Sequence, residues 1–218
     1  MQVKLIGITK PVNSVANTAS ALIGDMARVS NPKNQGKDAN GLLKYLIKHK
    51  HWSPFEMVHV VMEITTTRDI SRQILRHRSF SFQEFSQRYA EAQNFTSTRQ
   101  ARLQDYSNRQ NSIVPDNEEA VPLGLAFDKL QRNVLVEAKS AYRQALDLGI
   151  AKEQARALLP EGLTETTMYM GGTLRSWIHY VELRSANGTQ REHMDIAVAC
   201  RDILKENFPF LNEYWENQ

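Results

Sequence analysis

Residues 58–89 read V-H-V-V-M-E-I-T-T-T-R-D-I-S-R-Q-I-L-R-H-R-S-F-S-F-Q-E-F-S-Q-R-Y. The first ten, 58–67, are rich in β-branched side chains and predict a strand. Residues 70–77 then predict a short helix, which Asp69 or Ser71 can cap. We therefore expect a strand that leads almost directly into a helix, followed by a polar run that ends at Tyr89.

Arginines recur every four residues through the predicted helix, at Arg68, Arg72 and Arg76. This spacing places them on one helix face, with Gln73 and His77 in a second column beside them. Like charges at this spacing repel each other, so such a face favours an anionic partner. Phosphate is the natural partner because a guanidinium binds it through two parallel hydrogen bonds.

The run after the helix combines cationic, hydroxyl and aromatic side chains. Arg76, Arg78 and Arg88 fall within 13 residues, with three serines and Glu84 between them. Phenylalanines at 80, 82 and 85 can form an apolar wall, and an apolar pocket with a few convergent polar groups is how proteins hold small ligands. The alternative is a solvated basic face in which Ser81-x-x-Glu84 is a helix capping box.

The remaining chain predicts a fold of the α+β class, with a small, mainly antiparallel sheet packed by many helices. We expect a first strand at 3–9 and a long polar loop at 94–120. The C-terminal half reads as mainly helical. The predicted helices start at Asn17 or Thr18 and end at 27, and then cover 41–49, 123–148, 151–159, 164–184 and 189–206.

Composition indicates a single domain spanning 1–218. The chain has 218 residues, enough for a sizeable core, and a net charge of +3, which is low for a dedicated nucleic-acid binder. No segment approaches the roughly 20 apolar residues of a membrane helix, and the first residues do not resemble a signal peptide. The single cysteine, Cys200, excludes an internal disulfide, so we expect a reducing, cytoplasmic compartment. The lack of a long apolar segment and the low net charge predict no membrane partner and no nucleic-acid partner.

His51 with Ser53, and Cys200, each allow a structural and a functional interpretation. His51 and Ser53 lie in H-W-S-P-F-E at 51–56, where a lone loop histidine is usually structural. No second histidine or cysteine stands at zinc spacing, so we predict no metal site. Cys200 lies in D-I-A-V-A-C-R-D-I-L, whose helical spacing indicates a small core residue.

The run Arg76-His77-Arg78, with Ser81, Glu84, Ser86, Arg88 and Tyr89, resembles the R-H-R-x-x-S-x-x-E-x-S-x-R-Y motif of flavin-dependent thymidylate synthases. The resemblance extends to A-R-V-S at 27–30, H-W-S-P-F-E at 51–56, A-R-A-L-L-P at 155–160 and L-R at 183–184. It spans most of the chain in order, and the 94–120 segment falls outside it.

The resemblance implies that dUMP is methylated to dTMP, with 5,10-methylenetetrahydrofolate as the carbon source. It also implies tightly bound FAD that NADPH reduces, and a homotetramer whose active sites are shared between subunits. The cosubstrate partners are therefore small molecules, namely dUMP and the folate.

The resemblance also implies residue roles, position by position. The positions that match the FAD site are Ser30, His51, Ser53, Arg76, His77, Arg78, Glu84 and His179. The positions that match the dUMP site are Gln73, Arg76, Glu84, Ser86, Arg88, Arg156 and Arg184. Met57, Thr173 and His179 depart from the residues common in the family. These departures affect the expected contacts to the flavin ring, not the reaction class.

Two of these positions, Arg184 and Ser86, are the catalytic candidates. Uracil must become electron-rich at C5 before it attacks a one-carbon unit, and the other class of thymidylate synthase uses a cysteine for this. Because Cys200 lies in a predicted core helix, the resemblance gives the task to Arg184, whose guanidinium can stabilise enolate charge at a ring carbonyl. Ser86 is then a binding group, since no histidine at motif spacing can activate it.

Two other classes of function remain open on the sequence. The arginine helix and its phenylalanines are compatible with a nucleic-acid-binding module, although the low net charge and Glu84 argue against one. The arginines of a structural or interaction protein would simply form ion pairs. Flavin colour that bleaches with NADPH separates the enzyme from both alternatives.

Overall fold

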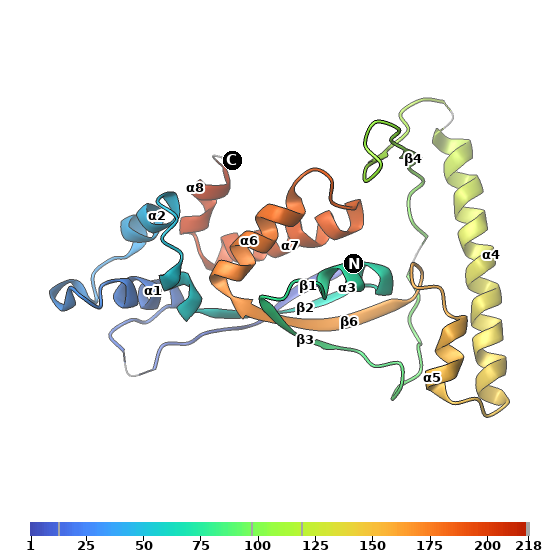
Figure 1. Cartoon of the computed structure of the whole chain (residues 1–218), viewed down its shortest axis with the longest axis horizontal. Coiled ribbons are helices and arrows are strands. Elements are labelled where there is room, and N and C mark those ends of the chain that lie inside the picture. The colour runs from blue at the N-terminus through green and yellow to red at the C-terminus, as the bar shows by residue number, and fades with distance from the viewer. Residues whose placement is uncertain (13, 97, 119, 217–218) are drawn as a thin grey trace.

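In the computed structural model, which describes residues 1–12, 14–96, 98–118 and 120–216, strand β2 (His59–Thr67) leads directly into helix α3 (Arg68–Ile74) (Figure 1). The helix starts earlier and ends earlier than predicted, and its N-cap residue is Thr67 rather than Asp69 or Ser71. The chain turns away because the His77 backbone N–H donates to the Ile74 carbonyl at 3.0 Å. The expected column of three arginines is therefore broken, with the third one in a turn.

Four antiparallel strands form the main sheet in the order β1 (Gln2–Ile8), β2, β6 (Glu165–Thr173) and β3 (Phe80–Glu84). Strand β1 confirms the strand expected at 3–9. The helix expected at 164–184 is wrong in its first half, which is β6, and only α6 (Leu174–Ser185) is helical. The reason is pairing with distant segments, because β6 pairs with β2 from His59↔Thr173 to Thr67↔Glu165 and with β3 on its other side.

Strand β3 replaces the capping box considered for Ser81 and Glu84. Both residues lie in extended backbone paired with β6. The pairing places Phe80 against Gly172, where an added Cβ would lie 2.5 Å from the phenylalanine ring. Gly172 therefore allows the Phe80 ring to pack across the sheet.

One face of the sheet carries the main core. Alternate side chains of β2 and β6 are fully buried there, and helices α3, α6 and α7 (Arg191–Asn207) lie along this side (Figure 1). Burial of each such side chain contributes about 1.5–3 kcal/mol. The core side chains from the two strands are Val60, Met62, Ile64, Met168 and Met170. The other face is more open, and Tyr169 on it is 43% exposed.

The N-terminal helices pack at one end of this layer. Helix α1 (Ala19–Ala27) is capped by Thr18, whose hydroxyl accepts from the Ala21 N–H at 3.1 Å, as the sequence predicts. Helix α2 (Asn40–Lys48) lies beside α8 (Phe210–Glu216), which sequence reasoning missed. Short 3₁₀ helices η1 (Pro32–Asn34) and η2 (Ser53–Met57) connect the elements before β2.

Helix α4 (Ala120–Asp147) stands at the opposite end, next to α5 (Lys152–Ala155) and the 3₁₀ turn η3 (Arg156–Leu158) (Figure 1). A small second core joins α4 to α5, built from Tyr142, Ala145, Ala155 and Leu159. Helix α4 also exposes apolar side chains to solvent, namely Val121, Leu125, Leu130, Val134 and Val136.

The polar segment at 94–120 is mostly irregular, as predicted, with a short hairpin of β4 (Leu103–Gln104) and β5 (Ser112–Ile113). It is tied to the rest of the chain: Thr98 hydrogen bonds to Asp128 of α4, and the Thr96 N–H donates to the Leu163 carbonyl at 3.1 Å. Nowhere in the described ranges is a helix both long enough and apolar enough to cross a bilayer.

Candidate active site

The turn between α3 and β3 places Arg76, His77 and Arg78 at the edge of the helical layer. His77 is half-buried, with its ring against Tyr180 at 4.9 Å between centroids. Arg76 and Arg78 are exposed, and among the described residues neither forms an ion pair. The turn therefore presents two uncompensated cations on either side of a packed imidazole.

Arg184, near the end of α6, reaches this turn. Its Nε–H donates to Nε2 of His77 at 2.9 Å, so the His77 proton resides on Nδ1. Burial lowers the pKa of His77 to about 4, and the adjacent Arg184 charge contributes in the same direction. His77 is consequently neutral at physiological pH and acts as an acceptor that orients the guanidinium.

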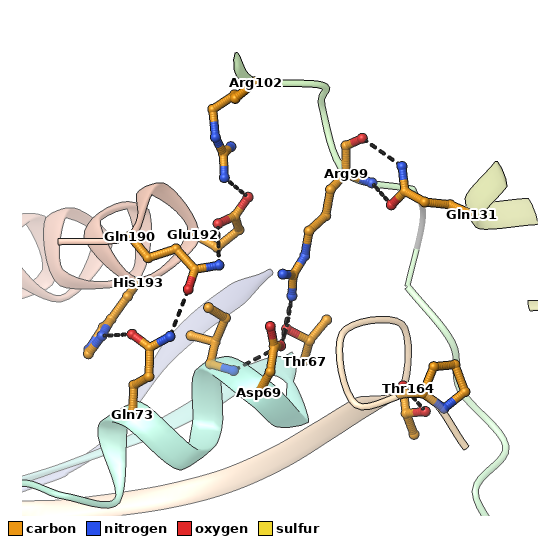
Figure 2. Close-up of polar contacts among 12 residues, drawn as sticks. Thr67, Asp69, Gln73, Arg99, Arg102, Gln131, Thr164, Gln190, Glu192 and His193 are labelled. Atoms are coloured by element: carbon orange, nitrogen blue, oxygen red, sulfur yellow. Dashed lines mark hydrogen bonds and ion pairs between the residues drawn. The ribbon is translucent and has the colours of Figure 1, made fainter. Parts of the chain in front are cut away.

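Gln73 lies on α3 and faces α7 (Figure 2). Its Nε2 donates to Oε1 of Gln190 at 2.7 Å, and its Oε1 is 3.3 Å from Nδ1 of His193. His193 is fully buried, and its Nε2 lies 3.1 Å from the Tyr180 hydroxyl. Burial, followed by the charges of Arg184, His77 and Arg76, lowers the pKa of His193 to about 3.

Sequence reasoning missed His193, Gln190 and Tyr180. The available signal was the spacing of Gln190 and His193, which are three residues apart and so share one face at the start of α7. A histidine on the inner face of an apolar helix gives no indication of its partners until the fold brings α3 beside it.

The two arginines that begin the predicted column have carboxylate partners. Arg68 lies 3.8 Å from Glu84, and Arg72 forms an ion pair with Glu161. The expectation that this face requires a phosphate is therefore wrong for these two. It also weakens the nucleic-acid alternative, because a phosphate-binding surface needs unpaired cations.

Glu84 lies where β3 meets α3. Its Oε1 accepts from the Ser71 hydroxyl at 2.5 Å and from Thr166 at 2.9 Å. Ser86 follows in a tight turn, where its hydroxyl accepts from the Arg88 N–H at 3.4 Å. Glu84 is thus anchored within its own chain.

Arg88 and Arg156 gather in a separate group beside α5. Arg88 Nε is 3.3 Å from Glu153, and Arg156 Nε donates to the Glu153 carbonyl at 3.2 Å. No hydrogen bond or ion pair joins this group to Arg184 or His77 within the described chain. Helix α5 also stands apart from α6 in Figure 1.

A third group surrounds η2. His51 lies among exposed rings, 6.2 Å from both Tyr45 and His49 between centroids, and Ser53 begins η2. His179 of α6 stacks edge-on against Trp52 at 4.6 Å. Ser30 lies in the turn after α1 and is exposed.

Glu56 links two of the departures from the family pattern. Although burial acts to raise the pKa of Glu56, hydrogen bonds from Thr173 and Arg175 and the Arg175 and His179 charges lower it. Met57, the third departure, is exposed. Among the described residues, no hydrogen bond or ion pair joins the predicted site residues of the R-H-R turn to those beside α5 or η2.

Two cavities in the described part of the chain lie outside the Arg184–His77 contact. A groove of about 710 Å³ lies between α2 and α8, away from the arginine turn, and a smaller cavity of about 210 Å³ adjoins Phe85 and Thr166. No cluster of three or more histidine, cysteine or acidic side chains suited to a metal occurs in those residues. Cys200 is fully buried in α7, and burial raises the pKa of its thiol well above the usual range.

Comparisons with known proteins extend this picture. Residues 4–210 match the protein family described as thymidylate synthase complementing protein. The chain is 52% identical over 213 residues to a probable flavin-dependent thymidylate synthase of Paramecium bursaria Chlorella virus 1, covering 96% of each chain. It is 45% identical over 212 residues to a flavin-dependent thymidylate synthase of Synechocystis, again covering 96% of each. The fold is similar to a crystal structure of the UMP/dUMP methylase PolB from Streptomyces cacaoi bound to 5-Br dUMP, with a TM-score of 0.77, 25% identity and coverage of 99% and 94%.

Proposed function

Because the chain belongs to the flavin-dependent thymidylate synthase family and is a methyltransferase, we propose that it methylates dUMP to dTMP. The proposed carbon donor is 5,10-methylenetetrahydrofolate, and the proposed reductant is NADPH acting through bound FAD. We place this reaction in one domain formed by residues 1–218, in the reducing environment of the cytoplasm, which suits a single free cysteine.

The observation that carries the proposal is the 2.9 Å contact between Arg184 and His77. It joins the guanidinium of Arg184 on α6 to the R-H-R turn, so two segments of the family resemblance that are far apart in the chain meet in the fold. Arg184 has no carboxylate partner among the described residues, which leaves its terminal nitrogens available to a ligand. A cation without a protein counter-ion in a partly buried position favours an anionic or electron-rich ligand.

In the proposed reaction, Arg184 donates hydrogen bonds to a ring carbonyl of uracil. Enolate character on that oxygen makes C5 electron-rich before C5 attacks the one-carbon unit, and a preorganised guanidinium stabilises this charge on the activated ring. His77 holds Arg184 in place through the acceptor nitrogen of a neutral ring. The positioning needs no proton transfer at His77, so the arginine retains its charge and geometry throughout.

The structure offers little support for a covalent nucleophile from this chain's cysteine or serine. Cys200 is enclosed in the core and its thiol resists ionisation. Ser86 has no histidine partner among the described hydrogen bonds, and its hydroxyl closes its own turn. We therefore propose that Ser86 binds the nucleotide and that Arg184 activates the ring.

The residues of the R-H-R turn fit FAD. A dinucleotide carries a diphosphate, and Arg76 and Arg78 supply two exposed guanidinium groups without protein partners in the described chain. We propose that they hold FAD with His77, Ser30, His51, Ser53, Glu84 and His179. Bound FAD supplies the reducing equivalents that NADPH provides and participates in carbon transfer. Gln73, Arg76, Glu84, Ser86, Arg88, Arg156 and Arg184 are proposed to hold dUMP.

Two observations support a homotetramer with shared active sites. Arg88 and Arg156 lie beside α5, with no hydrogen bond or ion pair to the R-H-R turn among the described residues, so we infer that neighbouring copies complete each site. Helix α4 and the open face of the sheet also expose apolar side chains, including Leu125, Val136 and Tyr169, that association can bury.

Tritium release from C5-labelled dUMP tests the proposal. Purified protein is expected to be yellow, or to become yellow with FAD, and its flavin absorbance should bleach with NADPH. Release should require the folate, NADPH and FAD together. A colourless protein that does not retain FAD, or one that leaves the label on dUMP under all conditions, would overturn it.

A further inference from the structure

Three side chains, His193, Gln73 and Gln190, connect Tyr180 to the carboxylate of Glu192 through a continuous series of hydrogen bonds. Figure 2 shows the part of this series from His193 to Glu192. The Tyr180 hydroxyl lies 3.1 Å from His193 Nε2, and His193 Nδ1 lies 3.3 Å from Gln73 Oε1. Because a carbonyl oxygen only accepts, this contact assigns the imidazole proton to Nδ1 and leaves Nε2 to accept from Tyr180. Gln73 Nε2 then donates to Gln190, and Gln190 Nε2 donates to Glu192 Oε2 at 3.0 Å. Every donor in the series points toward Glu192.

Glu192 determines that direction because an ionised carboxylate only accepts. The Gln190 amide must turn its NH₂ group toward Glu192, which leaves its carbonyl for Gln73. Gln73 must in turn donate to Gln190 and accept from His193. A flipped Gln73 amide would set its carbonyl against the carbonyl of Gln190, so one orientation is selected.

The charge on Glu192 depends on a residue from the 94–120 segment. Arg102 Nη2 donates to Glu192 Oε1 at 2.6 Å, and the two side chains are only 13% and 10% exposed. Burial acts to raise the pKa of Glu192, but the hydrogen bond from Arg102 is the largest of several effects that lower it. Arg102 is itself held in the hairpin, where its Nε donates to Ser112 at 2.9 Å.

We propose that Arg102 is a positioning residue for nucleotide binding, acting through Glu192 and Gln190 to hold the Gln73 amide in one orientation. With both neighbours satisfied, Gln73 keeps one N–H and one carbonyl lone pair for a ligand. Docking of the Arg102 side chain on α7 thereby sets the affinity for dUMP. This inference rests on the proposed function, in which Gln73 contacts dUMP.

The test compares dUMP binding and turnover in full-length, FAD-loaded enzyme. Arg102→Gln should raise both the Kd of dUMP, measured by calorimetry, and its KM about tenfold, which corresponds to about 1.4 kcal/mol. The kcat at saturating dUMP should change less than about twofold, because Arg102 touches no reacting atom. Arg102→Lys keeps a cation beside Glu192 and should restore most of the affinity.

A double-mutant cycle shows whether Arg102 acts through Gln73. In a Gln73→Ala background, Arg102→Gln should leave the weakened Kd of dUMP unchanged. Additive effects of the two substitutions on the Kd would overturn the proposal that Arg102 acts through the hydrogen-bond series. If Arg102→Gln does not fold, Gln190→Ala breaks the same series at a half-buried position and should raise the Kd alike.

Arg99→Gln is the matched control. Arg99 ties the same segment to Thr67 and Asp69 at 2.7 Å and is outside the series (Figure 2). Its substitution should leave the Kd of dUMP within about twofold of wild type. An increase in Kd equal to that of Arg102→Gln would show that attachment of the segment, and not the hydrogen-bond series, sets the affinity, which would overturn the proposal. A wild-type enzyme that releases no tritium contradicts the proposed function itself, while an active enzyme whose Arg102→Gln variant binds dUMP normally contradicts only this inference.

Discussion

Protonation of His193 should destabilise the fold at mildly acidic pH. The imidazole is fully buried, and its pKa is about 3 in the folded protein, against an ordinary value of 6.5. Between pH 6.5 and about 3, His193 is therefore protonated in the unfolded chain and neutral in the folded chain. Stability is complete above pH 6.5 and is lost as the pH falls from there toward about 3.

The size of the loss follows from the same two pKa values. At pH 5.0 the pH lies about 1.5 units below the unfolded-state pKa of His193. Each unit lowers the free energy of unfolding by about 1.36 kcal/mol, so the loss is about 2 kcal/mol. For a chain of this length, about 2 kcal/mol lowers the Tm by roughly 4–8 °C. His77, with a pKa of about 4, adds a loss of the same sign in the same window.

The assay is thermal unfolding at pH 7.5 and 5.0, followed by tryptophan fluorescence at fixed protein concentration. His193→Gln cannot take up the proton, so its Tm should fall roughly 4–8 °C less than that of wild type between the two pH values. His49→Gln replaces an exposed histidine and should follow wild type. Equal acid sensitivity of wild type and His193→Gln would refute the assignment of a neutral, buried imidazole.

Three further predictions test the fold and the chemistry. Gly172→Ala places a Cβ 2.5 Å from the Phe80 ring and should destabilise by about 1–3 kcal/mol in urea unfolding, whereas Gly171→Ala, which meets only Val61 at 3.5 Å, should cost less; equal losses would contradict the packing argument. Arg184→Ala should reduce tritium release by at least about 10²-fold while flavin absorbance persists, and normal turnover would remove Arg184 as the activating group. Cys200→Ala should lower stability by about 1 kcal/mol and leave kcat unchanged, so loss of turnover in a folded variant would indicate a role for the thiol.

Local sequence patterns predicted the elements that depend on local signals. Thr18 caps α1 where expected, and the β-branched run before Arg68 is a strand. The helix predicted at 164–184 is wrong before Leu174, where Met168 and Met170 stand two residues apart and are buried on one face of β6. Its extended backbone is imposed by β2 and β3, which lie on both sides of it and whose register no local pattern encodes.

The sequence of β3 carries a strand signal beside the capping-box spacing. Phe80 and Phe82 alternate with Ser81 and Gln83, which is the two-residue period of a strand with one buried face. The Ser81-x-x-Glu84 spacing is also that of a capping box, and nothing in the sequence alone decides between the two. In the fold, Gly172 opposite Phe80 decides it, because only a glycine there lets the ring pack on the sheet.

The candidate site shows a similar division between local and distant information. The motif identified Arg76, His77 and Arg78 together, and they lie in one turn. It could not indicate that Arg184 would meet His77, since 107 positions separate them in the chain. The hydrogen-bond series to Glu192 could be predicted still less from the sequence. Arg102 comes from a segment with no regular pattern, and that segment lies outside the family resemblance.

Charge pairing separates two kinds of arginine in this protein. Arg99 and Arg102 are largely buried with carboxylates, and loss of either partner would leave an uncompensated charge, so neither guanidinium is free to contact a ligand. Arg76, Arg78 and Arg184 have no such partner among the described residues and all lie at the R-H-R turn or against it. Arg88 is intermediate, because its pair with Glu153 is 62% and 49% exposed and such pairs contribute about 0–1 kcal/mol. A phosphate can therefore displace Glu153 at little cost, which makes Arg88 available to a nucleotide in a way that Arg99 and Arg102 are not.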